Sequence, residues 1–332
     1  MEKEFRNKTI LVTGGTGSIG SELVAQLLKF KPKQIRVLSR DESKQYYLQE
    51  RLNYPKNLRL LIGDIRDKER LDLALRNVDI VFHAAALKHV PFCEYNPFET
   101  VKTNILGSQN IIDAALKYGV KKVVAISTDK AANPDNIMGT SKLMMEKLFI
   151  NANYYTGKAE TKFSCVRFGN VAWARGSVLP LWKNQAERKK TIHVTDKEMT
   201  RFLMTIDNAA KLVLKAAQLS HGGEIFILKM PAIKLADLAN LFIKKHFPGQ
   251  KIKIKVIGLR PGEKIHEELF GGNDQYKQIL ENKEMLIIVP NIEIYHLTRP
   301  LEPYPGFQKR NASSGSYSSK DSIDIKKIKK IV

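Results

Sequence analysis

The sequence TILVTGGTGSIG, residues 9–20, decides the fold of this chain. Residues 9–13 form a short, β-branched apolar run of strand length, and a glycine-rich turn and a helical pattern follow directly. Glycines in such a turn let the backbone approach a pyrophosphate, while the helix N-terminus offers free N–H groups and a positive dipole. We therefore predict a dinucleotide-phosphate site made by Gly14, Thr16, Gly17, Ser18, Ile19 and Gly20.

Similar apolar runs recur along the chain and are separated by segments of helix length. They lie at residues 34–39, 58–62, 78–83, 122–127, 164–168 and 224–228. These runs are nearly continuous rather than alternating, as expected of strands buried on both faces. The pattern predicts an α/β fold of the Rossmann type, a doubly wound parallel sheet with helices on both faces.

Two stretches break this rhythm and indicate a second, smaller unit. Residues 171–200 are rich in Trp, Arg and Pro without a clean period, and from residue 231 a predicted helix (234–246) and strand (251–256) follow. We expect a dinucleotide-binding domain over 1–170 and 201–230, a smaller α/β substrate-binding domain over 171–200 and 231–310, and a tail over 311–332. The tail is predicted to be a Ser-rich loop over 311–321 with a short helix over 323–332.

The length and composition limit which classes of protein this chain can belong to. A chain of 332 residues that is 43% apolar can bury a large core, which excludes a disordered protein. Cys93 and Cys165 cannot form a disulfide framework and fit a reducing compartment. No apolar run approaches the roughly 20 residues that span a bilayer. We expect a soluble, cytoplasmic protein without integral membrane association.

The formal net charge of +21 comes from Lys and Arg spread along the whole length, with a dense cluster at residues 326–330. No zinc-finger spacing or RNA-binding aromatic signature accompanies it, so we expect no nucleic-acid partner. We interpret most of this charge as a solvated surface; an anionic substrate, a membrane surface or an acidic partner is the alternative for the rest. The seven histidines and two cysteines show no metal-ligand spacing, and we assign no metal.

The end of the second predicted strand, Ser39-Arg40-Asp41, bears on which dinucleotide binds. A site selective for NAD places a carboxylate at this tip to accept the ribose hydroxyls. Ser39 occupies the place, and the guanidinium fork of Arg40 suits a 2′-phosphate. We predict NADP, with NAD as the alternative that Asp41 leaves open.

Two further segments follow later strands and are predicted to contact the cofactor. Asp64 and Ile65 come after the third strand, where the adenine is read. His83 ends the fourth strand and is interpreted as a packed or cofactor-side group. The three small residues that follow it, Ala84, Ala85 and Ala86, allow close approach of the cofactor.

The stretch STDK, residues 127–130, and the stretch MGTSK, residues 138–142, carry the candidate chemistry. A lysine four residues after an aromatic, on a helix behind a strand that ends in Ser or Thr, is the layout of short-chain dehydrogenase/reductases. Met138 stands where that layout has a tyrosine, and a thioether has no proton to exchange. Either the adjacent Asp129 and Lys130 have taken over the catalytic duties, or the protein binds a cofactor without chemistry.

Together these motifs resemble one family, the UDP-N-acetylglucosamine 4,6-dehydratases. These enzymes form the polysaccharide-biosynthesis branch of the extended short-chain dehydrogenase/reductases and serve bacterial capsule, O-antigen and flagellin-glycan pathways. The similarity runs from about residue 8 to 270, and some members carry methionine at the position of Met138. The matching segments are residues 13–18, 39–42, 83–88, 127–131, 167–171, 176–178, 199–202 and 260–264.

The resemblance implies an internal redox reaction on a UDP-N-acetylhexosamine. A hydride leaves C4 for the nicotinamide and returns to C6 after loss of the C5 proton and the C6 hydroxyl, with or without inversion at C5. Lys130 as the C5 base requires a lowered pKa, and Asp129 as the C6 acid requires a raised one. Thr128 is expected to hydrogen-bond the 4-hydroxyl, and Lys142 to hold the nicotinamide ribose. The alternatives are that Asp129 caps the helix beginning near Pro134 and that Lys142 lies on a solvated helix face.

Substrate contacts are implied by the same resemblance. Asn170, Arg201 and Arg260 are similar to the family's nucleotide-sugar contacts, and Glu263 lies in the Arg260 motif. Lys88 and Glu94, in the loop after the fourth strand, are expected to line the sugar pocket. The family also implies a homo-oligomer, a hexamer or a dimer.

Two rival functions stay open. A UDP-sugar 4-epimerase uses the same fold but needs no C5 base, so the Asp129–Lys130 pair argues against it. A non-catalytic NADP-binding regulator is suggested by Met138, but such a protein has no need of the substrate-side motifs at Arg201 and Arg260.

Overall fold

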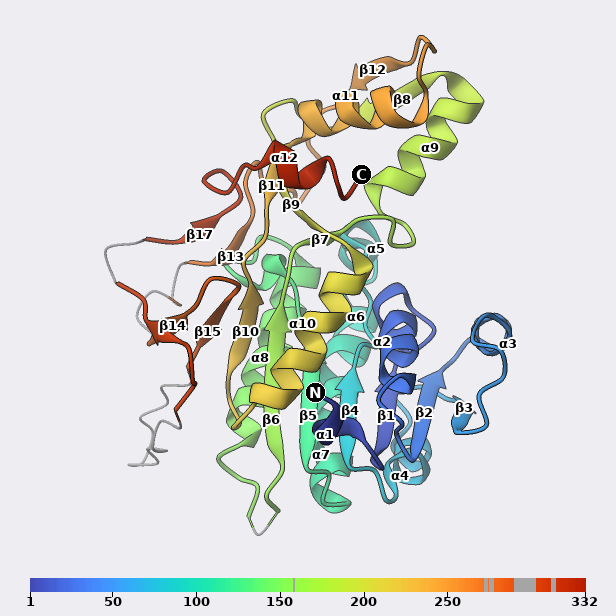
Figure 1. Ribbon diagram of the computed structural model, residues 1–332, viewed down its shortest axis with the longest axis vertical. Helices are drawn as coiled ribbons and strands as arrows, with labels where there is room; N and C mark the ends of the chain where they lie inside the picture. Colours follow the sequence, from blue (N-terminus) through green and yellow to red (C-terminus); the bar gives the residue numbers. More distant parts are fainter. Residues whose placement is uncertain (158, 272–273, 275–277, 290–302, 312–314) are drawn as a thin grey trace.

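The structure is a computed structural model that describes residues 1–157, 159–271, 274, 278–289, 303–311 and 315–332 (Figure 1). Its centre is a 10-stranded sheet with the strand order β16-β14-β15-β10-β6-β5-β4-β1-β2-β3. The strands from β3 to β10 in that order pair in parallel, and β1 is buried along its whole length. The parallel strands are β1 (Thr9–Thr13), β2 (Gln34–Ser39), β3 (Leu58–Ile62), β4 (Ile80–His83), β5 (Lys122–Ile126), β6 (Lys162–Arg167) and β10 (Ile225–Leu228).

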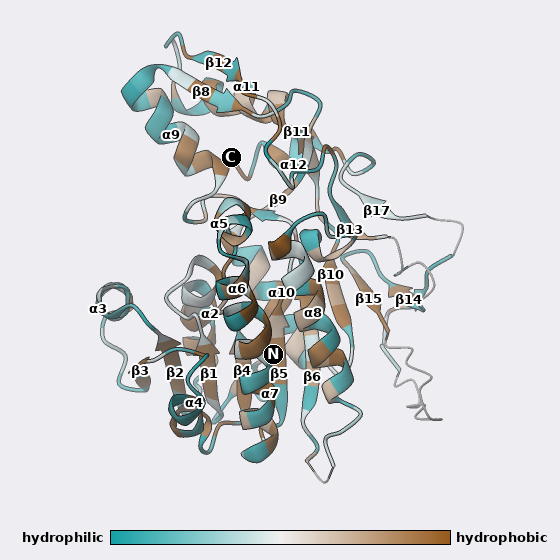
Figure 2. Cartoon of the chain, turned by 180° about the vertical axis from the view of Figure 1, so that it is seen from behind, coloured by the Kyte–Doolittle hydropathy of each residue, from teal (hydrophilic) through white to brown (hydrophobic). Residues whose placement is uncertain are grey.

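Helices cover both faces of this sheet, as the alternating pattern predicted. In Figures 1 and 2, α2 (Ser18–Leu28) and α10 (Ile206–Leu219) contact each other on one face. On the other face α7 (Gly107–Lys117) contacts both α4 (Lys68–Leu75) and α8 (Ile137–Ala152). The doubly wound Rossmann-type fold is thereby confirmed.

The remaining helices of the large unit are short or peripheral. Asp41 caps α3 by accepting a hydrogen bond from Lys44 N at 2.9 Å, which fixes where that helix begins. A six-residue π-helix leads directly into α7. These elements are α1 (Glu2–Phe5), α3 (Glu42–Arg51), α5 (Val90–Tyr95), α6 (Pro97–Thr100), η1 (Val101–Leu106) and η2 (Asp129–Ala131).

One edge of the large sheet is antiparallel. It is built by β15 (Met285–Ile288), β14 (Ile279–Glu281) and β16 (Gln308–Lys309), which add to β10 in that order. Here the structure differs from the expected division, which assigned residues 231–310 to the smaller domain. The apolar β15, buried at all four residues, completes the core beside β10 instead. Residues 290–302 of that predicted range lie outside the described residues.

A smaller unit with its own apolar core stands at one end of the sheet (Figure 1). Trp182 and Phe242 pack there with ring centroids 5.8 Å apart. The predicted strand 251–256 begins at Lys253 and pairs in parallel with β8. The unit contains β7 (Asn170–Val171), α9 (Val178–Lys189), β8 (Thr191–Val194), β9 (Thr200–Met204), β11 (Ala232–Lys234), α11 (Leu235–His246) and β12 (Lys253–Val256).

The C-terminal tail returns to this smaller unit. The helix predicted over 323–332 is shorter, α12 (Ile325–Ile328), and buries Ile328 in the small core. Within the predicted loop, β17 (Tyr317–Ser318) pairs with β13 (Glu268–Phe270); residues 312–314 lie outside the described residues. Over the described part of the chain, no helix combines the length and apolar character needed to cross a membrane.

Candidate active site

The glycine-rich turn after β1 lies where the strand order reverses, between β1 and β4, which is where open α/β sheets form a crevice. Gly14 has φ +63°, and a Cβ there would lie 2.7 Å from Ala85 N. A Cβ at Gly20 would lie 2.4 Å from the carbonyl oxygen of Gly14. Side chains would therefore open this turn, and the backbone forms the close cradle that a pyrophosphate needs.

The tip of β2 is arranged around hydroxyl groups and one exposed arginine. Ser39 Oγ and Thr16 Oγ1 are 2.7 Å apart. The Asp41 carboxylate accepts hydrogen bonds from the amide and ammonium of Lys44, which hold the pKa of Asp41 below its usual value. Arg40 lies 3.5 Å from Asp64 Oδ2 with 56% of its side chain exposed.

The adenine-side and nicotinamide-side residues are close to this turn. Asp64 Oδ2 accepts from Arg66 at 2.7 Å, and Ile65 is buried. Ala84 N donates to Thr13 O at 3.1 Å, and Ala84, Ala85 and Ala86 are half-buried. The predicted cofactor residues named here therefore lie at the carboxyl ends of β4, β1, β2 and β3, which are neighbours in the sheet.

Arg175 also reaches the glycine-rich turn, and the sequence analysis missed it. Its backbone N–H donates to Ser18 Oγ at 3.0 Å, and its guanidinium donates to the carbonyl oxygen of Thr16. Lys88 Nζ in turn donates to the carbonyl oxygen of Arg175 at 2.9 Å. Lys88, predicted to line the sugar pocket, thus ties the loop after β4 to the loop before α9, and Arg175 ties that second loop to the glycine-rich turn.

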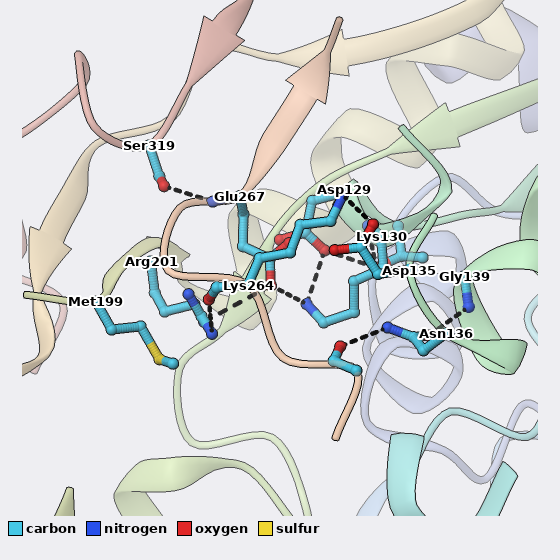
Figure 3. Close-up of polar contacts among 12 residues, drawn as sticks. Asp129, Lys130, Asp135, Asn136, Gly139, Met199, Arg201, Lys264, Glu267 and Ser319 are labelled. Carbon is cyan, nitrogen blue, oxygen red and sulfur yellow. Dashed lines mark hydrogen bonds and ion pairs between the residues drawn. The ribbon is translucent and has the colours of Figure 1, made fainter. Parts of the chain in front are cut away.

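An acid–base cluster lies at the carboxyl end of β5 (Figure 3). Thr128 Oγ1 donates to Asp129 Oδ1 at 2.8 Å. Lys130 Nζ lies 3.1 Å from Asp129 Oδ1 and 3.1 Å from Glu267 Oε1. Arg201 Nε lies 3.7 Å from the same Glu267 oxygen. Asp129 and Glu267 are 1% and 2% exposed, so the two carboxylates are almost fully removed from water, whereas the Lys130 side chain between them is 22% exposed.

Burial and charge act against each other in this cluster. Burial raises the pKa of Asp129, although Lys130 opposes the shift. Burial alone lowers the pKa of Lys130, but attraction to Asp129 and Glu267 outweighs it, and the pKa of Lys130 is raised. Burial alone raises the pKa of Glu267, but Lys130 and Arg201 hold it below its usual value. The shift of Asp129 has the direction that a general acid requires, whereas that of Lys130 is opposite to the lowered pKa expected of a base.

Two carboxylate oxygens in the cluster are unsatisfied. Asp129 Oδ2 and Glu267 Oε2 are buried and have no hydrogen-bond partner among the described residues. Gly169 lies beside the first of them, and a Cβ there would be 3.3 Å from Asp129 Oδ2. A buried oxygen without a partner is costly, so each is a place for a proton or for a donor supplied by a ligand.

The first turns of α8 decide between the alternatives left open for Asp129, as a helix cap, and for Lys142, on a solvated helix face. Asn136 caps α8, because its Oδ1 accepts from Gly139 N at 2.8 Å, so Asp129 is not the cap. Lys142 is 7% exposed and donates to the carbonyl oxygen of Ile126, which excludes a solvated helix face. Burial lowers the pKa of Lys142 to about 8. Met138 is 4% exposed on the same helix.

His83 is a packed group, as interpreted from the sequence. Its Nδ1 lies 2.8 Å from Thr13 Oγ1, its Nε2 lies 3.1 Å from Ser108 Oγ, and its ring stacks on Phe149. Burial, with the nearby Lys142 charge, lowers the pKa of His83 to about 3. The imidazole is therefore neutral at physiological pH.

One cavity of about 160 Å³ is lined mostly by residues of the smaller unit and shares Arg201 with the cluster. Four of the predicted substrate residues line it: Asn170, Arg201, Arg260 and Glu263. Within this wall, Arg201 also donates to the carbonyl oxygens of Thr200 and Lys264. Glu94 lies elsewhere, and its carboxylate accepts from Ile137 N at 2.7 Å, at the start of α8. Over the described ranges, no group of three or more His, Cys, Asp or Glu side chains is placed to hold a metal ion.

Glu267 and Asn104 are the other residues that sequence reasoning missed. Glu267 follows the Arg260 motif, but no pattern distinguishes it from the adjacent Glu268. Asn104, 1% exposed in the π-helix, accepts from Leu87 N at 2.8 Å and donates to Ser141 Oγ at 2.9 Å. A π-helix often marks a functional site, but its irregular hydrogen bonding has no sequence signature.

Comparison with known proteins gives this geometry its context. An uncharacterized membrane protein of Methanocaldococcus jannaschii is 51% identical over 99% of this chain and 96% of its own length. A UDP-N-acetylglucosamine 4,6-dehydratase (inverting) of Campylobacter jejuni is 48% identical over 82% of this chain and 80% of its own. A UDP-glucose 4-epimerase of Rickettsia akari is 44% identical over the same shares. The X-ray structure of Pen from Bacillus thuringiensis superimposes with a TM-score of 0.88 and 44% identity, covering 98% of both chains.

The model of one protein family, described as polysaccharide biosynthesis protein, matches residues 10–289. That range contains the glycine-rich turn, the acid–base cluster and the cavity residues. The resemblance inferred from the motifs is confirmed, and the chain belongs to the polysaccharide biosynthesis protein family.

Proposed function

We propose that this protein is an NADP-dependent UDP-N-acetylglucosamine 4,6-dehydratase that supplies a UDP-4-keto-6-deoxy sugar for surface polysaccharide or glycan synthesis. The observation that carries the proposal is the Asp129–Lys130–Glu267 cluster at the carboxyl end of β5, which contacts Arg201 in the wall of the cavity. Proton exchange at two adjacent sugar carbons needs an acid and a base side by side. The dehydratase of Campylobacter jejuni, 48% identical, supports the assignment of the substrate.

The residues of the crevice fit a nicotinamide dinucleotide. The turn at Gly14 and Gly20 excludes side chains and would receive the pyrophosphate. NADP is favoured over NAD because the Asp41 carboxylate is engaged with Lys44, whereas Arg40 is exposed and free to turn toward a 2′-phosphate. A nicotinamide bound there would supply the redox chemistry, as acceptor of the C4 hydride and donor of the C6 hydride.

Residues of the chain donate and accept the protons of the proposed reaction. Asp129 starts as a carboxylate, takes the proton of the 4-hydroxyl and, with its raised pKa, can hold that proton until it gives it to the departing C6 hydroxyl. Lys130 is the group for the C5 proton, and Thr128 is placed to pass the proton of the 4-hydroxyl to Asp129, to which it already donates. Lys142, with its ammonium directed at the end of β5, would hold the nicotinamide ribose.

The smaller unit is the proposed site of the nucleotide. Arg201 and Arg260 line its cavity, and arginine forks suit a diphosphate because they donate two parallel hydrogen bonds. Asn170 and Glu263 complete the same wall. In this proposal the large sheet holds the dinucleotide, the smaller unit holds UDP, and the sugar lies at the cluster between them. We also propose a cytoplasmic homo-oligomer, on the family resemblance alone.

The test is incubation of the purified protein with UDP-N-acetylglucosamine in deuterated water, followed by NMR of the sugar. Loss of the C6 hydroxyl with deuterium at C5 is the expected result, and the C5 coupling constants report retention or inversion. The double variant Asp129→Asn, Lys130→Ala should abolish both signals; full turnover in that variant would refute the assigned roles.

A UDP-sugar 4-epimerase is the second candidate, because the relative from Rickettsia akari carries that name. Epimerisation needs no acid or base at C5 and C6, which leaves Asp129 and Lys130 without a task. A UDP-N-acetylgalactosamine product without deuterium would establish the epimerase. An unchanged sugar with tightly bound cofactor would instead favour the non-catalytic regulator.

A further inference from the structure

Glu267 contacts the proposed base but was not singled out by any motif. It immediately precedes β13, is 2% exposed, and its Oε1 lies 3.1 Å from Lys130 Nζ. Its backbone is fixed from both directions, because Glu267 N donates to Ser319 Oγ and its carbonyl oxygen accepts from Ser319 N, both at 2.8 Å (Figure 3). The C-terminal tail thus holds this carboxylate against Lys130.

The charges around Lys130 come from four elements. Asp129 faces it from the same turn, and Glu267 faces it from the segment before β13. Arg201, on β9, acts on Glu267 and repels Lys130. Lys264 acts on Glu267 from the preceding loop and pairs with Asp135 at 3.4 Å. The ammonium therefore lies between two carboxylates, with two further cations behind the Glu267 side.

A protonated Lys130 has no lone pair and cannot remove the C5 proton until it has given one of its own away. Asp129 cannot take this proton in the C5 step, because it then already carries the proton received from the 4-hydroxyl, a neutral form that burial favours, and its Oδ1 also receives bonds from Thr128 and Lys130. Glu267 is ionised, in contact with the ammonium, and has a second oxygen without a partner among the described residues.

We propose that Glu267 is a positioning residue that fixes Lys130 and accepts its proton, so that Lys130 becomes the neutral base for C5. The inference rests on the proposed dehydratase function. In this step an N–H bond of Lys130 breaks and an O–H bond forms at Glu267 Oε1, which turns an ion pair into a neutral pair. Lys130 then takes the C5 proton, returns it to C5 after the hydride reaches C6, and recovers its first proton from Glu267.

The first experiment follows the proton on Lys130 without any turnover. The Nζ of Lys130, labelled with ¹⁵N and assigned with a Lys130→Arg variant, is titrated by NMR in wild type and in Glu267→Gln. In wild type this ammonium should remain protonated where exposed lysines titrate, near pH 10.4. In Glu267→Gln it should titrate below the exposed lysines, because one of its two carboxylates is gone while its burial remains. An unchanged titration would overturn the proposal, whatever the enzyme's substrate.

The second experiment measures deuterium uptake at C5 and kcat against pH. Glu267→Gln should lower kcat by about 10²–10⁴ at neutral pH with little change in KM, which is the usual range for one proton-transfer group. Its rate should recover as pH rises through the Lys130 pKa, since solvent then takes the proton that Glu267 cannot. Glu267→Asp, which keeps the carboxylate, should restore part of the neutral-pH rate.

The adjacent Glu268 provides the matched control. Its carboxylate accepts from Asn133 Nδ2 at 2.7 Å, away from Lys130, so Glu268→Gln should leave the Lys130 titration and the pH profile unchanged. A loss in Glu267→Gln that is the same at every pH would mean a structural role only and would overturn the proposal. A wild type inactive on UDP-N-acetylglucosamine would refute the proposed function instead, and the Lys130 titration would still decide the role of Glu267.

Discussion

Arg40 is the residue on which the choice of dinucleotide should depend, and Arg40→Ala is the perturbation that tests it. The contact of Arg40 with Asp64 is long, 3.5 Å, and the guanidinium is 56% exposed. An ion pair of this kind contributes about 0–1 kcal/mol, so releasing it costs little. A hydrogen bond to a charged phosphate contributes about 1.5–3 kcal/mol. The net gain of about 0.5–3 kcal/mol corresponds to about a 2- to 150-fold tighter Kd for NADP⁺.

The assay is calorimetric titration of wild type and Arg40→Ala with NADP⁺ and NAD⁺ at one fixed ionic strength. The variant should lose affinity for NADP⁺ by this factor and keep its affinity for NAD⁺, which lacks the 2′-phosphate. Raising the salt concentration should weaken NADP⁺ binding to wild type more than to the variant, because an exposed charge contact is screened.

Arg59→Ala is the control for a general loss of positive charge. Arg59 lies near the start of β3, at the opposite end of the strands, and donates to the carbonyl oxygen of Lys56 at 2.8 Å. It should change neither Kd. Equal losses for both dinucleotides in Arg40→Ala, or none for NADP⁺, would refute the assignment of Arg40 to the 2′-phosphate.

Three further predictions concern the cradle and the core. Gly20→Ala places a Cβ 2.4 Å from the carbonyl oxygen of Gly14, so dinucleotide affinity should fall by at least about tenfold in calorimetry while circular dichroism stays native. Arg167→Met removes the ion pairs that Arg167 makes with the buried carboxylates of Glu146 and Asp274. It should cost about 3–5 kcal/mol in urea unfolding, against at most about 1 kcal/mol for the exposed Lys211→Met. Between pH 6.5, the ordinary pKa of histidine, and about pH 3, the folded-state pKa of His83, this side chain binds a proton on unfolding. The free energy of unfolding of wild type should therefore fall relative to that of His83→Gln as pH falls through this window. Parallel curves of unfolding free energy against pH would contradict this.

The parallel sheet was predictable because each of its strands is a continuous apolar run with a helix before the next. The boundaries moved by at most two residues, as at β4, which begins at Ile80 rather than residue 78. The antiparallel edge could not be predicted in the same way. Its strands are short, and β15 joins β10 through register with residues almost 60 positions earlier in the chain, which no local pattern encodes.

In the candidate site too, residues close in sequence were predictable and residues brought together only by the fold were not. Asp129 and Lys130 are adjacent in sequence at a strand end, so their proximity followed from the motif. Glu267 comes from more than 130 residues later, and Ser319 of the C-terminal tail holds its backbone beside the cluster. Attraction to Asp129 and then to that distant carboxylate raises the pKa of Lys130, whereas the base role inferred from the sequence required a lowered one.

The methionine on α8 explains why such a cluster is needed at all. Met138 is 4% exposed, so neither a phenol nor bulk water stands at that point to exchange protons with a sugar hydroxyl. At the end of β5, Thr128, Asp129, Lys130 and Glu267 form an unbroken chain with contacts of 2.8, 3.1 and 3.1 Å. A proton can move along such a chain inside a site of low dielectric without a free charge appearing, because each donor has an acceptor next to it. In the proposed reaction this chain takes the place of the tyrosine, and its far end at Glu267 makes it longer than the Asp129–Lys130 pair.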